Sequence, residues 1–180
     1  MSARTITIHV KMDRKFLRSF ALFDTFLLKK QWKKPAGFAG ILLVFAAVCF
    51  LSGKPQSGLI GSVLLVLGIG LPVVYVAMFL SQVKERAKKM RLDPPRKVYT
   101  LTLAPDCVTI RNDMKAEADV RLEWDKIPAA FRMRRAVYLY ASAAKAFILP
   151  DGQADASPAE VWDFIVKHLP EGRANVKKKK

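Results

Sequence analysis

Two long stretches without a charged residue dominate the pattern of hydrophobic and polar positions along this 180-residue chain. They cover residues 36–52 and 58–83, and the residues between them, 53–57, are a cluster of turn formers. A helix needs about 20 apolar residues to cross the hydrocarbon core of a bilayer, with a usual range of about 17–25. The pattern therefore predicts two antiparallel transmembrane helices joined by a tight turn.

A cleaved signal peptide and a buried soluble hairpin both fit these apolar stretches less well than membrane spans do. A signal peptide begins close to the first methionine and ends in a cleavage site of small residues, whereas a long, charge-rich arm precedes residue 36. A helical hairpin in the core of a soluble protein normally keeps a polar face, and neither stretch has one.

The second stretch is interrupted by Gly61, Gly68, Gly70 and Pro72. Small residues allow two membrane helices to pack closely, and a proline kink is tolerated there, so we favour close packing of the hairpin over a kinked, ligand-admitting helix. Neither stretch contains an ionisable side chain, and nothing indicates an ion or proton path.

Positive charge is concentrated on both outer flanks of the apolar region. Trp32 lies at the first entry, where an indole ring suits the headgroup layer, and Lys54 is the single basic residue of the turn. Because basic residues favour the cytoplasmic side, we expect both termini in the cytoplasm at the inner membrane. The flanking residues expected to meet anionic lipid are Lys29, Lys30, Lys33, Lys34, Lys84, Arg86, Lys88, Lys89 and Arg91.

The amino-terminal arm contains a strand pattern followed by a helix pattern. Polar and apolar residues alternate over 5–12, which predicts a strand that pairs with a sheet elsewhere, most plausibly in the C-terminal domain, with His9 on its solvent side. Asp13 is a candidate cap for an amphipathic helix over 14–31. That helix is expected to lie on the cytoplasmic leaflet or, alternatively, to pack on the soluble domain.

The C-terminal part predicts an α+β domain. Short strand-like runs separated by turn signals imply antiparallel hairpins; they cover 98–103, 107–111, 119–124, 130–133, 136–141 and 146–149. Ser157 and Glu160 then form a capping box with Pro158 at the first helical position. An apolar stripe follows, with His168 at its edge as a partly buried packing residue, so one amphipathic helix is expected to pack on the sheet.

These features resemble the YcxB-like family of bacterial membrane proteins over nearly the whole chain. The residues that carry the resemblance, besides the N-terminal strand and the hairpin, are 122–127, 137–140, 146–150 and the helix 158–169. The resemblance implies a pleckstrin-homology-like domain, a bent antiparallel sheet or partial barrel closed by one C-terminal helix. It implies no activity, and this chain has Asp151 where many members carry a basic residue.

The charge distribution argues against nucleic acid as a partner. The net charge is +16, but the excess flanks the apolar stretches and does not spread over a folded face with interleaved aromatic residues. Only two cysteines and two histidines are present, without metal-ligand spacing, so neither a disulfide, a metal site nor a cofactor is expected.

Two polar clusters are candidate sites. Asp113, Glu117, Asp119, Glu123 and Asp125 alternate with basic residues and are interpreted as cross-strand ion pairs, not as a metal site. Arg132, Arg134 and Arg135 form a basic patch that either contacts a partner or anionic headgroups, or protects a strand edge. Phosphate loops, nucleophile elbows and zinc-protease motifs are absent from the sequence, so we expect a protein that is not an enzyme.

The predicted organisation has five parts. An N-terminal strand and juxtamembrane helix occupy 1–34, the hairpin 35–83, a charged stem 84–96, the β-rich cytoplasmic domain 97–172, and a basic tail 173–180 that ends in Lys177 to Lys180. We expect a membrane-anchored, non-catalytic binding or scaffold module with a protein partner or self-association. The alternative is an accessory subunit whose hairpin packs on a larger transporter or enzyme.

Overall fold

A computed structural model describes residues 5–114 and 118–176. The chain divides into two compact units, which we call the β-rich unit (1–16 and 91–180) and the helical unit (17–90). Lys177 to Lys180 of the predicted tail, together with Lys115 and Glu117 of the predicted charged hairpin, lie outside the described residues.

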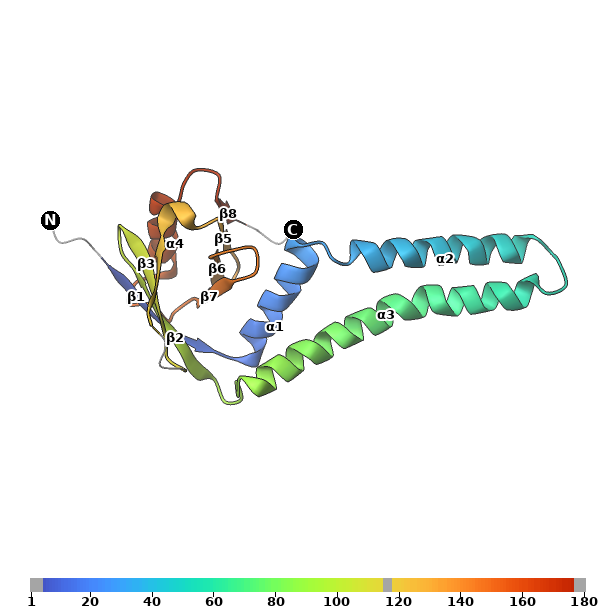
Figure 1. The fold of residues 1–180 in the computed structure, drawn as a ribbon, viewed down its shortest axis with the longest axis horizontal. Helices are drawn as coiled ribbons and strands as arrows, with labels where there is room; N and C mark the ends of the chain where they lie inside the picture. The colour runs from blue at the N-terminus through green and yellow to red at the C-terminus, as the bar shows by residue number, and fades with distance from the viewer. Residues whose placement is uncertain (1–4, 115–117, 177–180) are drawn as a thin grey trace. The chain divides into compact units, whose positions relative to one another are not determined.

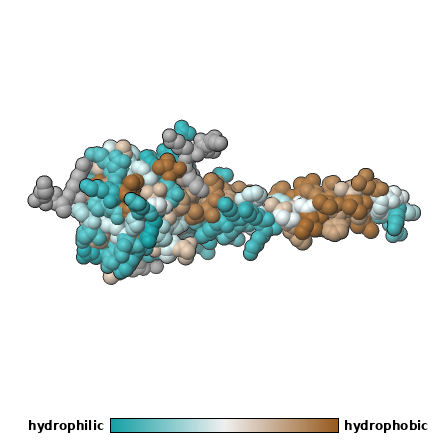
Figure 2. All heavy atoms as spheres, turned by 90° about the horizontal axis from the view of Figure 1, so that it is seen from above, coloured by the Kyte–Doolittle hydropathy of each residue, from teal (hydrophilic) through white to brown (hydrophobic). Residues whose placement is uncertain are grey.

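The helical unit contains two long helices, α2 (Lys33–Leu51) and α3 (Ser57–Lys89), as the two apolar stretches predict. Each is long and apolar enough to cross a membrane, and only 11% and 6% of their most apolar windows are buried. Figure 2 shows this hydrophobic surface as a band over the two helices, bounded by hydrophilic residues at the turn. The surface differs from that of a core helix in a soluble protein, which buries its apolar residues.

Glycines of α3 allow this helix to pack closely against α2. Gly61 lies so close to α2 that a Cβ atom there would be 3.2 Å from the carbonyl oxygen of Ala46. A Cβ atom on Gly68 would be 3.0 Å from Leu43 and 3.4 Å from the carbonyl oxygen of Ala39. Close packing through small residues, predicted for the hairpin, is therefore confirmed at two of the three glycines; Gly70 has open space beside it.

The charged stem is partly helical, which the sequence boundary at residue 84 did not anticipate. α3 continues through Lys84 to Lys89, because lysine, glutamate, arginine and alanine all favour helix. It ends before the Asp93-Pro94-Pro95 sequence that predicts the stop.

The β-rich unit contains two four-stranded sheets and the helix α4 (Pro158–His168), as Figure 1 shows. In the first sheet, neighbouring strands are antiparallel and follow chain order: β1 (Ile6–Met12), β2 (Arg96–Leu103), β3 (Cys107–Asn112) and β4 (Val120–Glu123). The second sheet has the order β7 (Ala146–Pro150), β6 (Ala136–Tyr140), β5 (Ala129–Arg132) and β8 (Ala174–Val176). The α+β class and the six predicted C-terminal strands are confirmed, whereas the single bent sheet is replaced by two.

The strand β8 corrects the predicted tail. Its three residues pair in parallel with β5, with Ala130 opposite Ala174. Arg173 fixes this segment, because its guanidinium donates a hydrogen bond to the carbonyl oxygen of Ile127 at 2.9 Å. Three residues without alternation give no strand pattern, which is why the sequence predicted only a tail.

The N-terminal strand belongs to the β-rich unit, as predicted. β1 pairs along its length with β2, from Ile6 opposite Leu103 to Met12 opposite Arg96. Arg14 and Asp93 form an ion pair of 2.9 Å just beyond this end of the sheet. The helical unit is therefore an insertion between two adjacent strands of one folded unit.

The two sheets are joined through a fully buried core. Leu101, Val108, Ile127, Leu139 and Ile165 are each 0% exposed. Tyr99 of β2 places its hydroxyl against β7, where it donates to the carbonyl oxygen of Ile148 at 2.8 Å and accepts from the Ile148 N–H at 2.7 Å.

Helix α4 begins as the sequence predicts. The Ser157 hydroxyl accepts from the Glu160 N–H, and the Glu160 carboxylate accepts from the Ser157 N–H, which completes the capping box. Val161 and Ile165 are the buried residues of this helix.

Candidate functional site at the basic flanks of the hairpin

The basic residues that follow the second apolar stretch lie on the last turns of α3. Lys84, Arg86, Lys88 and Lys89 are all exposed. Cations near a helix C-terminus interact favourably with the helix dipole, so these positions also stabilise the end of α3. Arg91 lies beyond the helix with a positive φ of 51° and belongs to the β-rich unit, not to the helical unit.

The basic residues before the first apolar stretch surround the start of α2. Lys33 and Lys34 are in its first turn, and Lys30 adopts a positive φ of 49° immediately before it. Lys29 forms an ion pair of 2.7 Å with Asp24. Eight of the nine predicted lipid-contact residues therefore belong to the helical unit, at the two ends of chain that enter and leave the hairpin.

The predicted amphipathic helix is two segments. α1 (Arg14–Leu22) is α-helical, and η1 (Phe23–Leu28) is a π-helical turn in which the Lys29 N–H donates to the Asp24 carbonyl oxygen at 2.9 Å. No residue of α1 is buried. π-Helical turns are rare and frequently occur at functional sites.

The π-helical turn η1 packs on α3. The ring of Phe26 meets Tyr75 and Phe79 edge-on, at centroid distances of 6.3 and 5.1 Å, and Phe23 is only 2% exposed. These contacts lie within the helical unit. The later part of the predicted amphipathic segment therefore packs its apolar side against α3, whereas the sequence predicted contact with either the membrane surface or the soluble domain.

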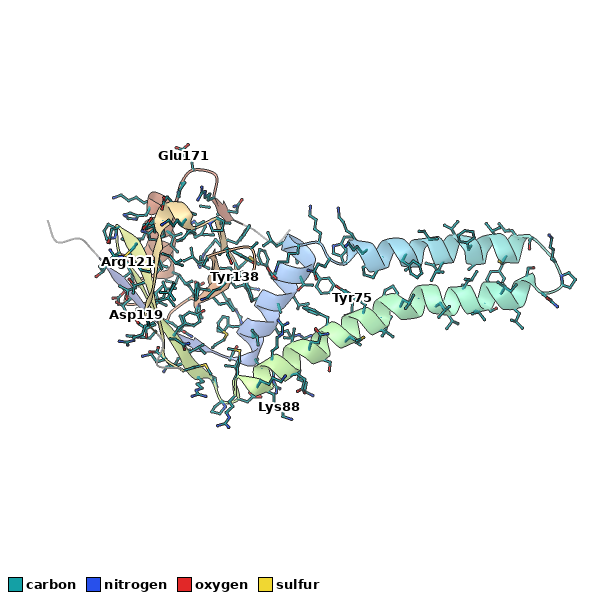
Figure 3. The ribbon with its side chains drawn as sticks, viewed as in Figure 1. Tyr75, Lys88, Asp119, Arg121, Tyr138 and Glu171 are labelled. Atoms are coloured by element: carbon teal, nitrogen blue, oxygen red, sulfur yellow. The ribbon has the colours of Figure 1, made fainter. Side chains whose placement is uncertain are left out.

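A groove of about 520 Å³ lies between these segments and α3, entirely within the helical unit. Its apolar wall includes Leu17, Phe20, Met78, Phe79 and Val83. Its polar wall includes Asp24, Thr25, Lys29, Gln31, Tyr75 and Arg86; Figure 3 labels Tyr75 on α3. Two predicted lipid-contact residues, Lys29 and Arg86, are thereby brought to one concave surface, which the sequence did not indicate.

Of the three arginines in the predicted basic patch, Arg132 forms an ion pair. Arg132 makes two hydrogen bonds to the Asp151 carboxylate, at 2.6 and 3.0 Å, and both side chains are about three-quarters buried. Arg134 and Arg135 are exposed in the turn between β5 and β6. Asp151, the position that departs from the resembled family, is thus the ion-pair partner of Arg132.

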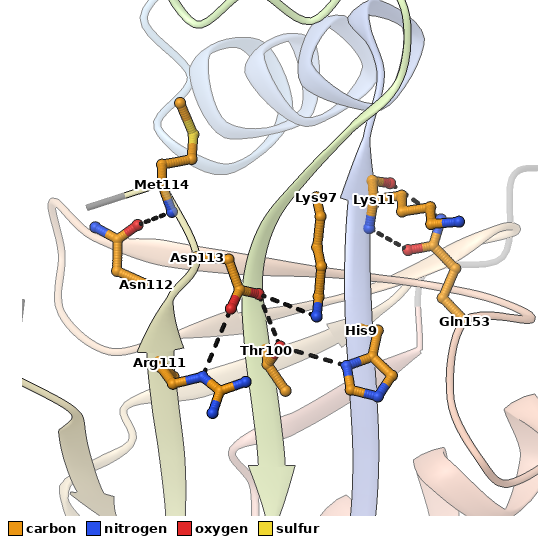
Figure 4. Close-up of polar contacts among 9 residues, drawn as sticks. All are labelled: His9, Lys11, Lys97, Thr100, Arg111, Asn112, Asp113, Met114 and Gln153. Atoms are coloured by element: carbon orange, nitrogen blue, oxygen red, sulfur yellow. Dashed lines mark hydrogen bonds and ion pairs between the residues drawn. The ribbon is translucent and has the colours of Figure 1, made fainter. Parts of the chain in front are cut away.

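The cross-strand ion pairs predicted for the charged hairpin are found in part. Asp113 pairs with Lys97 of a neighbouring strand, whereas the other pairs of its acidic residues are local in sequence, and the ion pairs of the described residues do not include Asp119 or Asp125. Figure 4 shows Asp113 between Lys97 and Arg111, at 3.7 and 3.5 Å, with the Thr100 hydroxyl donating to it at 2.7 Å. Glu123 pairs with Lys126 at 2.9 Å. Arg121 also pairs with Asp106. Interaction with Cys107 first, and then with Asp106, raises the pKa of the Arg121 guanidinium. Backbone hydrogen bonding first, and then Arg121, lowers the pKa of Asp106.

The two histidines lie in different surroundings within the β-rich unit. His9 is exposed, as predicted, and its Nδ1 lies 3.3 Å from the Thr100 hydroxyl (Figure 4). That hydroxyl already donates to Asp113, so His9 does not receive its proton. His168 is partly buried, as predicted, and stacks on Trp124 with a centroid distance of 5.6 Å. Within the described residues, no group of three or more His, Cys, Asp or Glu could hold a metal ion.

Comparisons with known proteins give no relative. The sequence matches no protein-family model, and no curated protein and no solved structure is significantly similar to the chain. The function is therefore argued from the geometry of the two units.

Proposed function

We propose that the chain is an integral membrane protein in which the two-helix hairpin anchors a non-catalytic binding module at the cytoplasmic face of the inner membrane. The module is the β-rich unit, and its partner is a protein, a second copy of the chain or a lipid headgroup. The proposal assigns no reaction and no cofactor to the chain.

The observation that carries this proposal is the position of the insertion. Met12 and Arg96 are cross-strand neighbours in the first sheet. Both α2 and α3, with their basic flanks, lie between these two residues in the sequence. Strands that pair are on the same side of any membrane, so the chain has to leave and return. Two spans satisfy this condition, and the tight turn at 53–57 is consistent with them.

The surface of α2 and α3 supports lipid as their surroundings. Large apolar side chains point outward along both helices; Phe38, Phe45 and Val66 are 55%, 58% and 66% exposed. Exposed apolar patches of this extent are rare on soluble monomers. The eight basic residues at the open end of the hairpin, against Lys54 alone in the turn, favour the cytoplasm for the β-rich unit.

The strand order supports a pleckstrin-homology-like module of the YcxB-like kind. Strands β1 to β4 follow one another in one sheet, β5 to β7 follow one another in the other, and α4 comes after both. The parallel strand β8 is an addition to that plan. In this proposal the loop between β5 and β6, in which Arg134 and Arg135 are exposed, is the part of the module that contacts the partner.

Membrane fractionation combined with a topology reporter tests the proposal. Full-length protein is expected in the membrane pellet after a carbonate wash, and a reporter after Lys180 is expected to be active only in the cytoplasm. A reporter inserted at Gln56, in the turn, should show the opposite activity. Recovery of the protein in the supernatant without detergent would contradict the anchor, and a far-side C-terminal reporter would contradict the orientation.

The alternative is an accessory subunit whose hairpin packs on a larger membrane protein. One observation favours it: a Cβ atom at Gly37 or Gly40 of α2 would meet nothing within 4 Å, so this part of the helix is open to a neighbour. Replacing 33–57 and the apolar part of α3 with an unrelated two-span hairpin separates the two functions. A binding module keeps its partners after this exchange, whereas an accessory subunit loses them.

A further inference from the structure

We infer that the groove between α1, η1 and α3 binds one anionic phospholipid, with its phosphate on Arg86 and its glycerol and upper acyl chain along Phe79, Met78 and Val83. This inference rests on the proposed membrane location of the helical unit. The groove volume of about 520 Å³ lies within the range of small-molecule sites, roughly 300–1,000 Å³.

The polarity of the groove changes along α3 as the polarity of a phospholipid does. Tyr75 lies inside the apolar stretch that ends at Val83, whereas Arg86 lies one turn beyond that end. These two lining residues are separated by about 16 Å of helix, at about 1.5 Å per residue.

The charges in the groove favour an anionic headgroup. Among the described residues, no carboxylate forms an ion pair with Arg86. Lys29, the other cation that lines the groove, is already ion-paired with Asp24. A guanidinium binds phosphate through two parallel hydrogen bonds, so Arg86 is expected to supply most of the headgroup affinity.

The wall of the groove opposite α3 includes the irregular backbone of η1. Asp24 and Thr25 belong to the π-helical turn and also line the groove. The turn is followed by Lys30 with its positive φ of 49°. A regular α-helix would carry Lys29 to a different side of the segment, so the π-helical turn positions Lys29 on the groove.

Native mass spectrometry of the full-length protein in mild detergent tests this inference. The probes are dioleoylphosphatidylglycerol and dioleoylphosphatidylcholine, which differ in headgroup charge. Arg86→Gln is compared with Arg18→Gln, which removes the same charge from an exposed position of α1 outside the groove. We expect one retained phosphatidylglycerol in the natural protein. Binding should be at least about tenfold weaker in Arg86→Gln, because its charge-assisted hydrogen bonds to the phosphate are lost, and unchanged in Arg18→Gln.

Three results would overturn the inference. Equal losses in the two variants would show general attraction to a basic surface, and equal retention of both lipids would remove the role of the headgroup charge. Equal affinity for free glycerol phosphate would show that the apolar wall contributes nothing. A protein that fractionates with membranes but fails these tests contradicts only the lipid site, whereas a soluble protein contradicts the proposed function.

Discussion

The side-chain amide of Gln153 pairs with the backbone of Lys11 as a neighbouring strand would. Its Oε1 accepts from the Lys11 N–H at 2.7 Å, and its Nε2 donates to the Lys11 carbonyl oxygen at 3.0 Å (Figure 4). The same segment continues along the outer edge of β1, where the His9 N–H donates to the Gln153 carbonyl oxygen and the Asp155 N–H donates to Thr7. Residues 153–155 thus cover an edge that would otherwise present unpaired backbone groups.

Replacing Gln153 with Ala is expected to destabilise the β-rich unit by about 1–2 kcal/mol, because two hydrogen bonds to Lys11 are lost. The free energy of unfolding is measured by urea titration in detergent, followed by the fluorescence of Trp124 and Trp162. Gln153→Glu serves as the matched control: it retains the acceptor but not the donor, so its loss should be smaller. Equal stability of all three proteins would show that the edge of β1 does not need this cover.

Replacing Tyr99 with Phe is expected to cost about 1–3 kcal/mol of unfolding free energy, because the N–H and carbonyl oxygen of Ile148 lose their buried partner. Urea titration of the detergent-solubilised protein measures this loss. Tyr138→Phe provides a comparison for the removal of a second buried tyrosine hydroxyl.

Tyr99 also makes the β-rich unit sensitive to alkaline pH. Burial raises the pKa of Tyr99 above its ordinary value of 10.0, and burial raises the pKa of Tyr138 to about 12. The unfolded chain therefore releases these protons first, so their contribution to stability is complete below about pH 10 and is lost as the pH rises further. Stability measured from pH 8 to 11 should fall less steeply in Tyr99→Phe than in the natural protein.

The strands and the helix cap were predictable because each is a local pattern. Alternation identified β1, a strand-like run before a turn signal identified β2, and the capping box identified the start of α4. Pairing of β1 with the C-terminal domain followed from a physical requirement, since a single strand does not persist in water. The insertion of the hairpin inside the sheet was therefore implicit in the sequence.

The candidate site was less predictable because its contacts join distant residues. Lys29 and Arg86 are 57 positions apart, and no local pattern indicates that they line one groove. The groove depends on a π-helical turn, for which residues 23–28 carry no distinctive composition. The basic flanks were visible as charge, but the ion pairs that occupy Lys29 and Arg132 were not.

Replacing Gly61 with Leu is expected to separate α2 from α3, because its side chain would meet the Ala46 backbone and the Phe50 ring, both at 3.2 Å from the position of a Cβ atom. Overpacking of this kind costs about 1–3 kcal/mol. Spin labels at Phe38 and Ile69, both exposed, measure the separation. Gly70→Leu is the matched control, since nothing lies within 4 Å of that position; a broadened distance distribution in both variants would argue against packing through Gly61.

Replacing Arg132 with Gln is expected to lower the unfolding free energy of the β-rich unit by about 1 kcal/mol, because the paired Asp151 carboxylate loses both hydrogen bonds. Arg134→Gln removes the same charge from an exposed position and should change stability by less than about 0.5 kcal/mol. Urea titration distinguishes the two, and exchanging the residues as Arg132→Asp with Asp151→Arg should restore part of the loss. Equal effects of the two single substitutions would mean that the ion pair adds nothing.

The separation of β1 from β2 by the hairpin has a consequence for biosynthesis. β1 leaves the ribosome first, and at about 5–20 residues per second its partner follows only several seconds later, after both apolar segments. The first sheet therefore cannot be completed until the second apolar segment has been translated. Formation of the first sheet thus follows synthesis of both apolar segments, and in a chain truncated between them β1 has no β2 with which to pair.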